Sequence, residues 1–285
     1  MRLIYWKTGL VVGVIVLMFV CLCFPGRVQA RPLAIDVGGT ISVNTTWTKA
    51  NSPYVVTQSV YVNSGVVLTI EPGVLVKFTQ NTGLYIQGNG QLLAVGAVGE
   101  PIVFTSLRDD TYGGDTNGDG TVTVPAPGDW YTLSAYGSLS TLHLQHVVMR
   151  YSRTSVEAHG HLLLQDSTLE QGSVDGVYVY PNSGTAPNIT IERSTIRTQR
   201  TGIYIYDQPG SVTLLNNLFN SANSASAAIE LEKVVSGQVV SNTINVAGTA
   251  EQMRGILLNN VGDGLNVTNN TIVRSSNAKA LAGIE

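Results

Sequence analysis

The stretch that decides the fold is a run of similar short segments in the second half of the chain. Residues 176–180 read GVYVY, and residues 202–206 read GIYIY. The pattern returns at 228–232 as AIELE, at 255–259 as GILLN and at 283–285 as GIE, so the starts are separated by 26, 26, 27 and 28 residues. A period of this length without a helical pattern is typical of a solenoid whose repeats stack on one another.

A second strand series runs in step with the first. Its members cover residues 162–169, 189–196, 212–219, 239–244 and 267–272. Each period therefore holds short alternating strands and turns, which predicts an all-β parallel β-helix, a solenoid with three short strands per coil. The leucine-rich pattern L-x-x-L-x-L-x-x-N is absent, and a propeller blade needs about forty residues or more per unit.

Alternation within the strands assigns each side chain to a face. The residues predicted to point inward are Val177, Val179, Ile203, Ile205, Ile229, Leu231, Ile256 and Leu258. Two outward rows are predicted, Tyr178, Tyr204, Glu230 and Leu257 in one, and Tyr180, Tyr206, Glu232 and Asn259 in the other. Stacking in register places neighbours in a row about 4.8 Å apart. Asn217, Asn242 and Asn270 recur at one turn position and predict an asparagine ladder between coils.

The first half is less regular. Strands are predicted at 53–62, 66–70, 74–78, 83–87, 91–95 and 101–105, separated by Gly-, Asn- and Pro-rich turns. We expect residues 31–62 to form an N-terminal cap and residues 63–285 to form the β-helix, with an inserted loop at 108–129. The sequence stops within the strand pattern at 283–285, which predicts that the β-helix is truncated at its C-terminus.

The strand pattern over roughly residues 55–285 resembles the pectate-lyase-like superfamily of right-handed parallel β-helix proteins. The segment Leu68-Thr-Ile-Glu-Pro-Gly-Val-Leu-Val-Lys-Phe78, followed by Pro101-Ile-Val-Phe-Thr-Ser106, is similar to the opening coils of bacterial extracellular β-helix repeat proteins. The resemblance implies a right-handed β-helix. It leaves the chemistry open, because function depends on the site and not on the fold.

The first thirty residues predict a secretory signal peptide. A basic start precedes an apolar run at residues 10–24, and Val28-Gln29-Ala30 offers small residues for cleavage after Ala30. The alternative is an uncleaved membrane anchor, for which this run is short. Both cysteines, Cys21 and Cys23, lie in this segment, so the mature chain has no disulfide or thiolate metal site. We expect a secreted or cell-surface protein whose mature part does not span the membrane.

The charge balance argues against a nucleic-acid partner. Removing residues 1–30 takes 3 of the 16 basic residues and none of the 19 acidic residues, leaving a net charge of about −6. Binding to nucleic acid requires a basic surface that replaces counterions.

One loop has the spacing of a calcium site. Asp115, Asn117 and Asp119 occupy positions one, three and five of a six-residue segment that ends in Gly120. Position twelve is Ala126, so the bidentate acid of the full motif is missing. We expect either a structural calcium ion that orders this loop or an acidic, Asx-turn-rich loop without an ion.

The predicted outward rows suggest a carbohydrate-contacting surface. Aromatic faces stack on sugar rings, and adjacent carboxylates accept hydrogen bonds from hydroxyl groups. The candidate residues are Tyr178, Tyr180, Tyr204, Tyr206, Glu230 and Glu232. The alternative is that stacked tyrosines only stabilise the parallel coils.

No complete catalytic set is evident. Glu230 and Glu232 share a face, with Asp207 on the neighbouring coil, and hydrolysis needs two carboxylates at a defined separation. Arg200 and Lys233 are the basic residues that could serve a lyase near this face. The histidines at 143, 146, 159 and 161 suggest either a metal site or solvent-facing strand positions.

These features favour a secreted β-helix module for surface display, adhesion or glycan binding, without catalysis and with calcium as a possible structural ion. The alternative function is that of a polysaccharide lyase or glycoside hydrolase acting on extracellular polysaccharide. A passive spacer is a third hypothesis.

Overall fold

The computed structural model describes residues 33–182, 185–207, 210–221, 227–246, 253–274 and 281–285. Nearly all regular structure in these ranges is β-strand, accompanied by one short 3-10 helix, Lys49–Asn51. No helix in the described ranges is long and apolar enough to cross a membrane. The predicted signal peptide, residues 1–30, lies outside the described residues.

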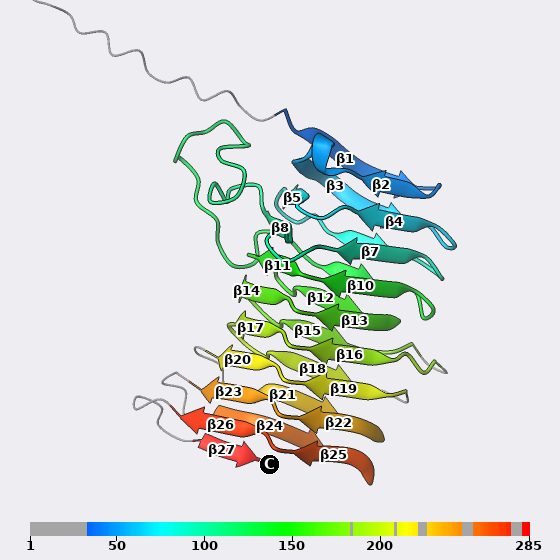
Figure 1. Ribbon diagram of the computed structural model, residues 1–285, viewed down its shortest axis with the longest axis vertical. Helices are drawn as coiled ribbons and strands as arrows, with labels where there is room; N and C mark the ends of the chain where they lie inside the picture. The colour runs from blue at the N-terminus through cyan, green and yellow to red at the C-terminus, as the bar shows by residue number, and fades with distance from the viewer. Residues whose placement is uncertain (1–32, 183–184, 208–209, 222–226, 247–252, 275–280) are drawn as a thin grey trace, which may run out of the picture. The chain divides into compact units, whose positions relative to one another are not determined.

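The chain winds through three faces in a fixed order, and each strand pairs in parallel with its counterparts one coil away (Figure 1). Face 1 contains β2 (Thr45–Trp47), β4 (Val67–Ile70), β7 (Gln91–Val95), β10 (Thr141–Gln145), β13 (His161–Gln165), β16 (Ile189–Glu192), β19 (Val212–Leu215), β22 (Ser236–Val240) and β25 (Gly264–Thr268). Face 2 contains β5 (Leu75–Phe78), β8 (Ile102–Ser106), β11 (Val147–Arg150), β14 (Thr168–Gly172), β17 (Thr195–Thr198), β20 (Leu218–Ser221), β23 (Thr243–Val246) and β26 (Thr271–Arg274). Face 3 contains β6 (Leu84–Ile86), β9 (Leu133–Ala135), β12 (Val156–Ala158), β15 (Val177–Val179), β18 (Ile203–Tyr206), β21 (Ala227–Glu232), β24 (Met253–Asn259) and β27 (Leu281–Ile284).

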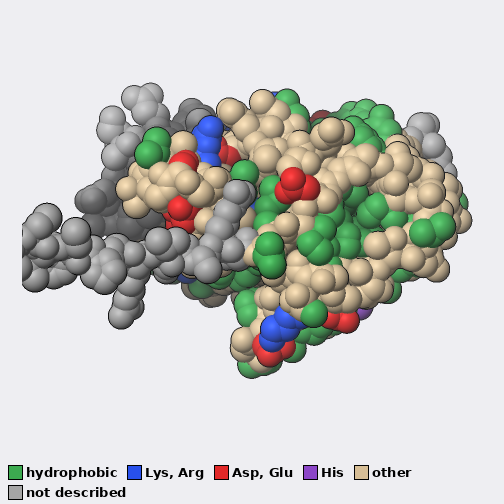
Figure 2. Space-filling view, turned by 90° about the horizontal axis from the view of Figure 1, so that it is seen from above, with side chains coloured by type: hydrophobic (Ala, Val, Ile, Leu, Met, Phe, Trp, Pro, Cys, Tyr) green, Lys and Arg blue, Asp and Glu red, His purple; other side chains and the backbone are tan. Residues whose placement is uncertain are grey.

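The first two long strands join faces 2 and 3. The first half of β3 (Tyr54–Val62) pairs with β5, and its second half pairs with β6. β1 (Ile35–Ile41) pairs in parallel with β3, and its register shifts between Val37 and Gly39. The parallel winding therefore already begins in β1 and β2, within the segment where the sequence suggested a cap. Viewed from above the first coil, hydrophobic side chains gather at its centre and are framed by polar ones (Figure 2).

The predicted repeat is confirmed in register and in face. Tyr178 pairs with Tyr204, Tyr204 with Glu230, and Glu230 with Leu257. The second strand series predicted from the sequence consists of two strands in each coil, one on face 1 and one on face 2. Together with the face 3 strand, each coil therefore has the three strands that were expected. The strands predicted between 53 and 105 correspond to β3 through β8.

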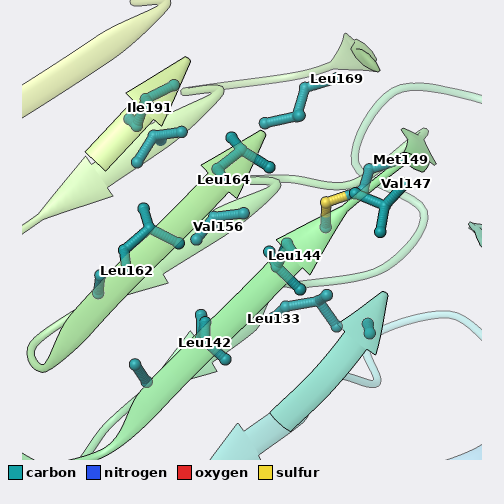
Figure 3. Packing of buried hydrophobic residues seen from close by; sticks show 14 of the residues in the cluster. Leu133, Leu142, Leu144, Val147, Met149, Val156, Leu162, Leu164, Leu169 and Ile191 are labelled. Carbon is teal, nitrogen blue, oxygen red and sulfur yellow. The ribbon is translucent and has the colours of Figure 1, made fainter. Parts of the chain in front are cut away.

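The interior is a continuous apolar column, as the alternation predicted. Figure 3 shows leucine and valine side chains from β9 to β14 that point toward one another across the coils, with Met149 among them. All of the predicted inward residues are buried except Leu258, which is partly buried and packs against the core. One coil cannot enclose these side chains, so stacking is what removes them from water. At about 25 cal/mol per Å², this burial is the main stabilising contribution.

The corner between faces 1 and 2 repeats the same backbone geometry. The residue that makes this corner has φ between 48° and 58° in the coils that contain His146, Asp166, Arg193, Asn216, Ser241 and Asn269. The residue that follows each corner donates its backbone N–H to the equivalent side chain on the next coil. Asn217 N donates to Asn242 Oδ1 at 3.0 Å, and Asn242 N donates to Asn270 Oδ1 at 2.9 Å. The asparagine ladder is thus confirmed, and Ser167 and Ser194 extend it toward the N-terminus.

One connection between faces 2 and 3 is much longer than the others. Residues 107–132 lie between β8 and β9 and contain no strand (Figure 1). This stretch includes the predicted inserted loop. It separates β6 from its face 3 neighbour β9 by many residues, although the two strands are paired.

Candidate functional site

Face 3 presents a continuous outward row that crosses most of the coils. We call it the tyrosine row, and in register it contains Tyr61, Tyr85, Ser134, Glu157, Tyr178, Tyr204 and Glu230. The ring centroids of Tyr61 and Tyr85 are 5.2 Å apart, and those of Tyr178 and Tyr204 are 5.5 Å apart. The strand positions on either side of each member are inward and buried, so these side chains face outward.

A second set of side chains lies two residues further along the same strands. We call it the flanking row, and it contains Tyr136, His159, Tyr180, Tyr206 and Glu232. The rings of Tyr180 and Tyr206 stack almost parallel, with centroids 5.3 Å apart and planes 7° apart. His159 makes edge contacts with Tyr136 and Tyr180, at 5.5 and 6.1 Å. The two rows together form a broad aromatic surface.

The tyrosine row forms the floor of a cleft of about 450 Å³. The wall comes from the turns that lead into face 3. The lining residues are Tyr85, Tyr131, Thr132, Arg153, Thr154, Glu157, Val174, Asp175, Tyr178, Arg200 and Tyr204. This volume lies within the range of small-ligand sites, which is about 300–1,000 Å³.

The charged groups of the cleft differ in how they are engaged. Arg200 donates to both oxygens of Asp175, at 3.1 and 2.6 Å, and Asp175 is buried. Glu157 Oε1 lies 3.3 Å from His159 Nε2. Arg153 is exposed, and its guanidinium has no side-chain partner among the described residues. The cleft therefore combines a fixed ion pair with a carboxylate and a guanidinium that are available to a ligand.

Three tyrosines of the row, Tyr85, Tyr178 and Tyr204, have a raised pKa and keep their protons at neutral pH. Burial, followed by the charge of Tyr61, raises the pKa of Tyr85 to about 12. Burial also raises the pKa of Tyr204 to about 12, and the Glu232 carboxylate that accepts the Tyr204 hydroxyl at 3.2 Å adds to the shift. Burial and then Glu157 raise the pKa of Tyr178. These rings therefore serve as neutral stacking surfaces and hydrogen-bond donors.

The two basic residues suggested for a lyase are poorly suited to take a proton. The pKa of Arg200 is raised chiefly by its hydrogen bonds to Asp175. The pKa of Lys233 is raised because its Nζ donates to the Tyr206 hydroxyl at 2.7 Å. Both side chains therefore remain protonated where a general base must be free to accept a proton.

A fully buried hydroxyl lies beneath the cleft. Ser134 has no exposed surface, and its Oγ has no hydrogen-bond partner among the described residues. The neighbouring Leu133 and Ala135 point into the core, so Ser134 faces outward between Tyr85 and Glu157. Burying an unpaired hydroxyl costs free energy, about 1–3 kcal/mol. Most buried polar groups have a hydrogen-bond partner, so the Ser134 hydroxyl is an exception.

The six residues predicted to contact sugar are brought onto one face, but the cleft is centred elsewhere. Only Tyr178 and Tyr204 of the six line it. Sequence reasoning missed Tyr85, Glu157 and the wall residues Tyr131 and Arg153, because the long connection at 107–132 hides the register of the earlier coils. The alternating Leu-Ser-Ala and Val-Glu-Ala patterns at 133–135 and 156–158 were the features of the sequence that could have revealed these two face 3 strands.

The long connection is fixed to face 2 by buried charges. Lys77 has no exposed surface, and its Nζ donates to the carbonyl oxygens of Asp109 and Gly114 at 3.0 and 2.9 Å. Burial lowers the pKa of Lys77 despite the nearby carboxylates. Arg150 Nη1 lies 2.8 Å from the Asp109 carboxylate, which is also fully buried. These contacts tie the long connection to face 2.

The predicted calcium ligands form a hydrogen-bonded loop. The Asp115 carboxylate accepts the backbone N–H groups of Gly118, Asp119 and Gly120 at 2.7–3.1 Å, and so holds the turn that follows it. Asn117 Nδ2 donates to Asp119 Oδ2 at 2.8 Å.

In the part of the chain that the structure describes, three oxygens of the same loop are buried without a hydrogen-bond partner. They are Oδ1 of Asp110, Asn117 and Asp119. Oxygens of this kind fit a calcium ion. Burial and Asp115 raise the pKa of Asp110. However, the described part of the chain contains no group of three or more His, Cys, Asp or Glu placed to hold a metal. Calcium therefore stays a prediction.

The histidines at 143, 146, 159 and 161 are distributed over separate places. His143 and His161 lie at outward positions of face 1, where His161 Nδ1 accepts the Asn188 N–H at 3.0 Å. His146 forms a corner, and His159 belongs to the flanking row. His143 and His161 agree with the outward strand positions suggested for these residues, whereas His159 is only 13% exposed and His146 lies at a corner.

Two family models match the chain. Residues 146–284 match the right-handed β-helix region, and residues 39–122 match the pectate-lyase-like β-helix domain. Neither the curated proteins nor the solved structures contain a match to it. With the parallel three-faced winding described above, these matches support a pectate-lyase-like, right-handed β-helix protein.

Proposed function

We propose that the chain is an exported, non-catalytic β-helix module that binds a glycan on face 3 and serves adhesion or surface display. The observation that carries this proposal is the cleft of about 450 Å³ whose floor is the tyrosine row. Sugar rings present C–H groups that pack on aromatic faces, while their hydroxyl groups pair with carboxylates and guanidinium groups. Tyr178 and Tyr204 supply the aromatic faces, and Glu157 and Arg153 supply the polar groups.

The flat and repeated arrangement favours an extended ligand. Ring centroids in the tyrosine row and in the flanking row repeat at 5.2–5.5 Å from coil to coil. A polysaccharide lying along the row would contact several coils with equivalent groups. The floor is largely preformed, because the strands beneath it are anchored in the apolar core.

The test is binding of purified protein to a glycan array, followed by calorimetry with each retained glycan. Tyr178→Ala and Tyr204→Ala should each weaken binding about tenfold or more, since each removes one stacking surface. Tyr112→Ala is the control, because Tyr112 lies in the long connection, outside both rows, and does not line the cleft. Absence of retention, or equal losses in all three variants, would contradict the proposal.

Catalysis is the alternative function, either as a polysaccharide lyase or as a glycoside hydrolase. The protonated state of Arg200 and Lys233 supports the non-catalytic proposal. Incubation with acidic and neutral polysaccharides provides the test. Release of unsaturated or reducing ends that disappears in Glu157→Gln, Glu230→Gln or Glu232→Gln would establish the enzyme instead.

A further inference from the structure

The charges on face 3 are unevenly distributed. The carboxylates in the tyrosine row and the flanking row are Glu157, Glu230 and Glu232, and neither row contains a lysine or an arginine. The basic residues lie beside the rows, at corners of the coils, and they include Arg153, Arg200 and Lys233. A ligand that lies along the rows therefore meets tyrosine faces and carboxylates first.

Two of these basic residues are already engaged by the protein. Arg200 is held by the buried carboxylate of Asp175 through two hydrogen bonds. Lys233 is held by Tyr206. Arg153 remains at the rim of the cleft, where Glu157 of the same coil provides an opposite charge. A polyanion would find one available guanidinium and the repulsion of the carboxylates in the rows.

One contact at the edge of face 3 shows how a tyrosine of the flanking row binds a primary ammonium group, that of Lys233. The Nζ of Lys233 lies 4.6 Å above the ring of Tyr206 and donates to the hydroxyl of that tyrosine at 2.7 Å. Cations are attracted to the electron-rich faces of aromatic rings. Tyr178 presents a ring of the same kind next to Glu157, and Tyr204 presents one next to Glu232.

We propose that the glycan recognised by face 3 bears primary amines, as glucosamine polymers do, and that uronic acid polymers are disfavoured. This inference rests on the proposed function. One ammonium group of the polymer packs against the ring of Tyr178 and donates a charge-assisted hydrogen bond to Glu157, and another packs against the ring of Tyr204 and donates to Glu232. The sugar rings stack on the tyrosines, so recognition combines two contacts that a uronate polymer cannot make together.

The experiment is calorimetric titration of the mature protein with three oligomers of equal length, namely β-linked glucosamine, its N-acetylated counterpart and galacturonate. The glucosamine oligomer should bind about tenfold or more tightly than the acetylated one, because acetylation removes the charge. Its affinity should fall as salt concentration rises. Glu157→Gln and Glu232→Gln should each weaken it about tenfold and leave the acetylated oligomer within about twofold. Asp36→Asn is the control, an exposed acid on β1 away from face 3.

The outcomes separate this inference from the proposed function. Equal binding of the glucosamine and acetylated oligomers, or tighter binding of galacturonate, would overturn the inference and leave glycan binding intact. Absence of binding for all three oligomers, together with an empty glycan array, would overturn both. Melting temperatures of the glutamine variants identify any loss that comes from unfolding, and the salt dependence of the unaltered protein tests the inference without a variant.

Discussion

The side-chain oxygen of Asn242 accepts two hydrogen bonds from Asn217 on the preceding coil, one from the backbone N–H and one from the side-chain amide, each at 3.0 Å. Asn242 Nδ2 donates in turn to the Leu214 carbonyl oxygen at 2.9 Å. Both asparagines are buried. Each side chain thus joins two coils at a corner where the strand ladder is interrupted.

Asn242→Ala should lower the free energy of unfolding by about 3 kcal/mol, because it leaves the Asn217 N–H and the Leu214 carbonyl buried without partners. Chemical denaturation measures the change. Asn266→Ala is the matched control, since Asn266 is exposed on β25, and it should change stability by about 0.5 kcal/mol or less. Equal effects of the two substitutions would contradict the role of the ladder.

Two arginines that contact Glu170 should differ strongly in their contribution to stability. Arg150 has 14% of its side chain exposed and also pairs with the fully buried Asp109 at 2.8 Å, whereas Arg197 is 50% exposed. Arg150→Ala should cost about 3 kcal/mol, because it leaves the Asp109 charge buried and unpaired. Arg197→Ala should cost about 1 kcal/mol or less. Denaturation curves with similar midpoints for both variants would show that the Arg150–Asp109 pair does not anchor the loop.

Stability should decline at alkaline pH through the tyrosine row. Burial raises the pKa of Tyr204 to about 12, above its value of about 10 in an unfolded chain. The folded protein therefore holds this proton more tightly, so the contribution to stability is complete below about pH 10 and is lost as the pH rises toward about 12. Tyr204→Phe should make the unfolding midpoint fall less steeply over this range, and Tyr85→Phe should act similarly. Unchanged slopes in both variants would refute the assignment.

The loop at 108–129 provides a test for calcium. If the unpartnered oxygens of Asp110, Asn117 and Asp119 bind the ion, calcium should raise the melting temperature and slow proteolysis within the loop. Asp119→Ala should abolish both effects, while Asp36→Ala should retain them. If chelation leaves the melting temperature and the cleavage rate of the unaltered protein unchanged, the contacts of Lys77 and Arg150 are sufficient to order the loop.

The repeat made much of the fold predictable. In-register parallel stacking follows from the period, so the contacts of Tyr178 with Tyr204 and of Tyr180 with Tyr206 were predictable from spacing alone. The asparagine ladder was predictable for the same reason. The positive φ angles at the corners were not predictable from the sequence, because residues as different as Arg193, Ser241 and Asn269 adopt them. The neighbouring coils, and not the local propensity, impose this geometry.

The cleft was harder to predict, because it forms from side chains that no single period connects. Tyr85 and Ser134 are adjacent in the tyrosine row, yet the long connection separates them in sequence. The ion pair of Arg200 with Asp175 joins two turns that lie one coil apart. Because of this pair, Arg200 is not suited to the role of general base that the sequence suggested. Such pairings depend on side-chain reach across coils, which a period does not encode.

The most direct test of the account is hydroxyl-radical footprinting of the protein with and without a saturating glycan, read out by mass spectrometry. The cleft predicts protection of Tyr131, Tyr178 and Tyr204, with no change at Tyr112, which lies in the long connection and does not line the cleft. Protection on face 1, or the same oxidation of Tyr178 and Tyr204 with and without glycan, would contradict the claim that face 3 is the binding surface.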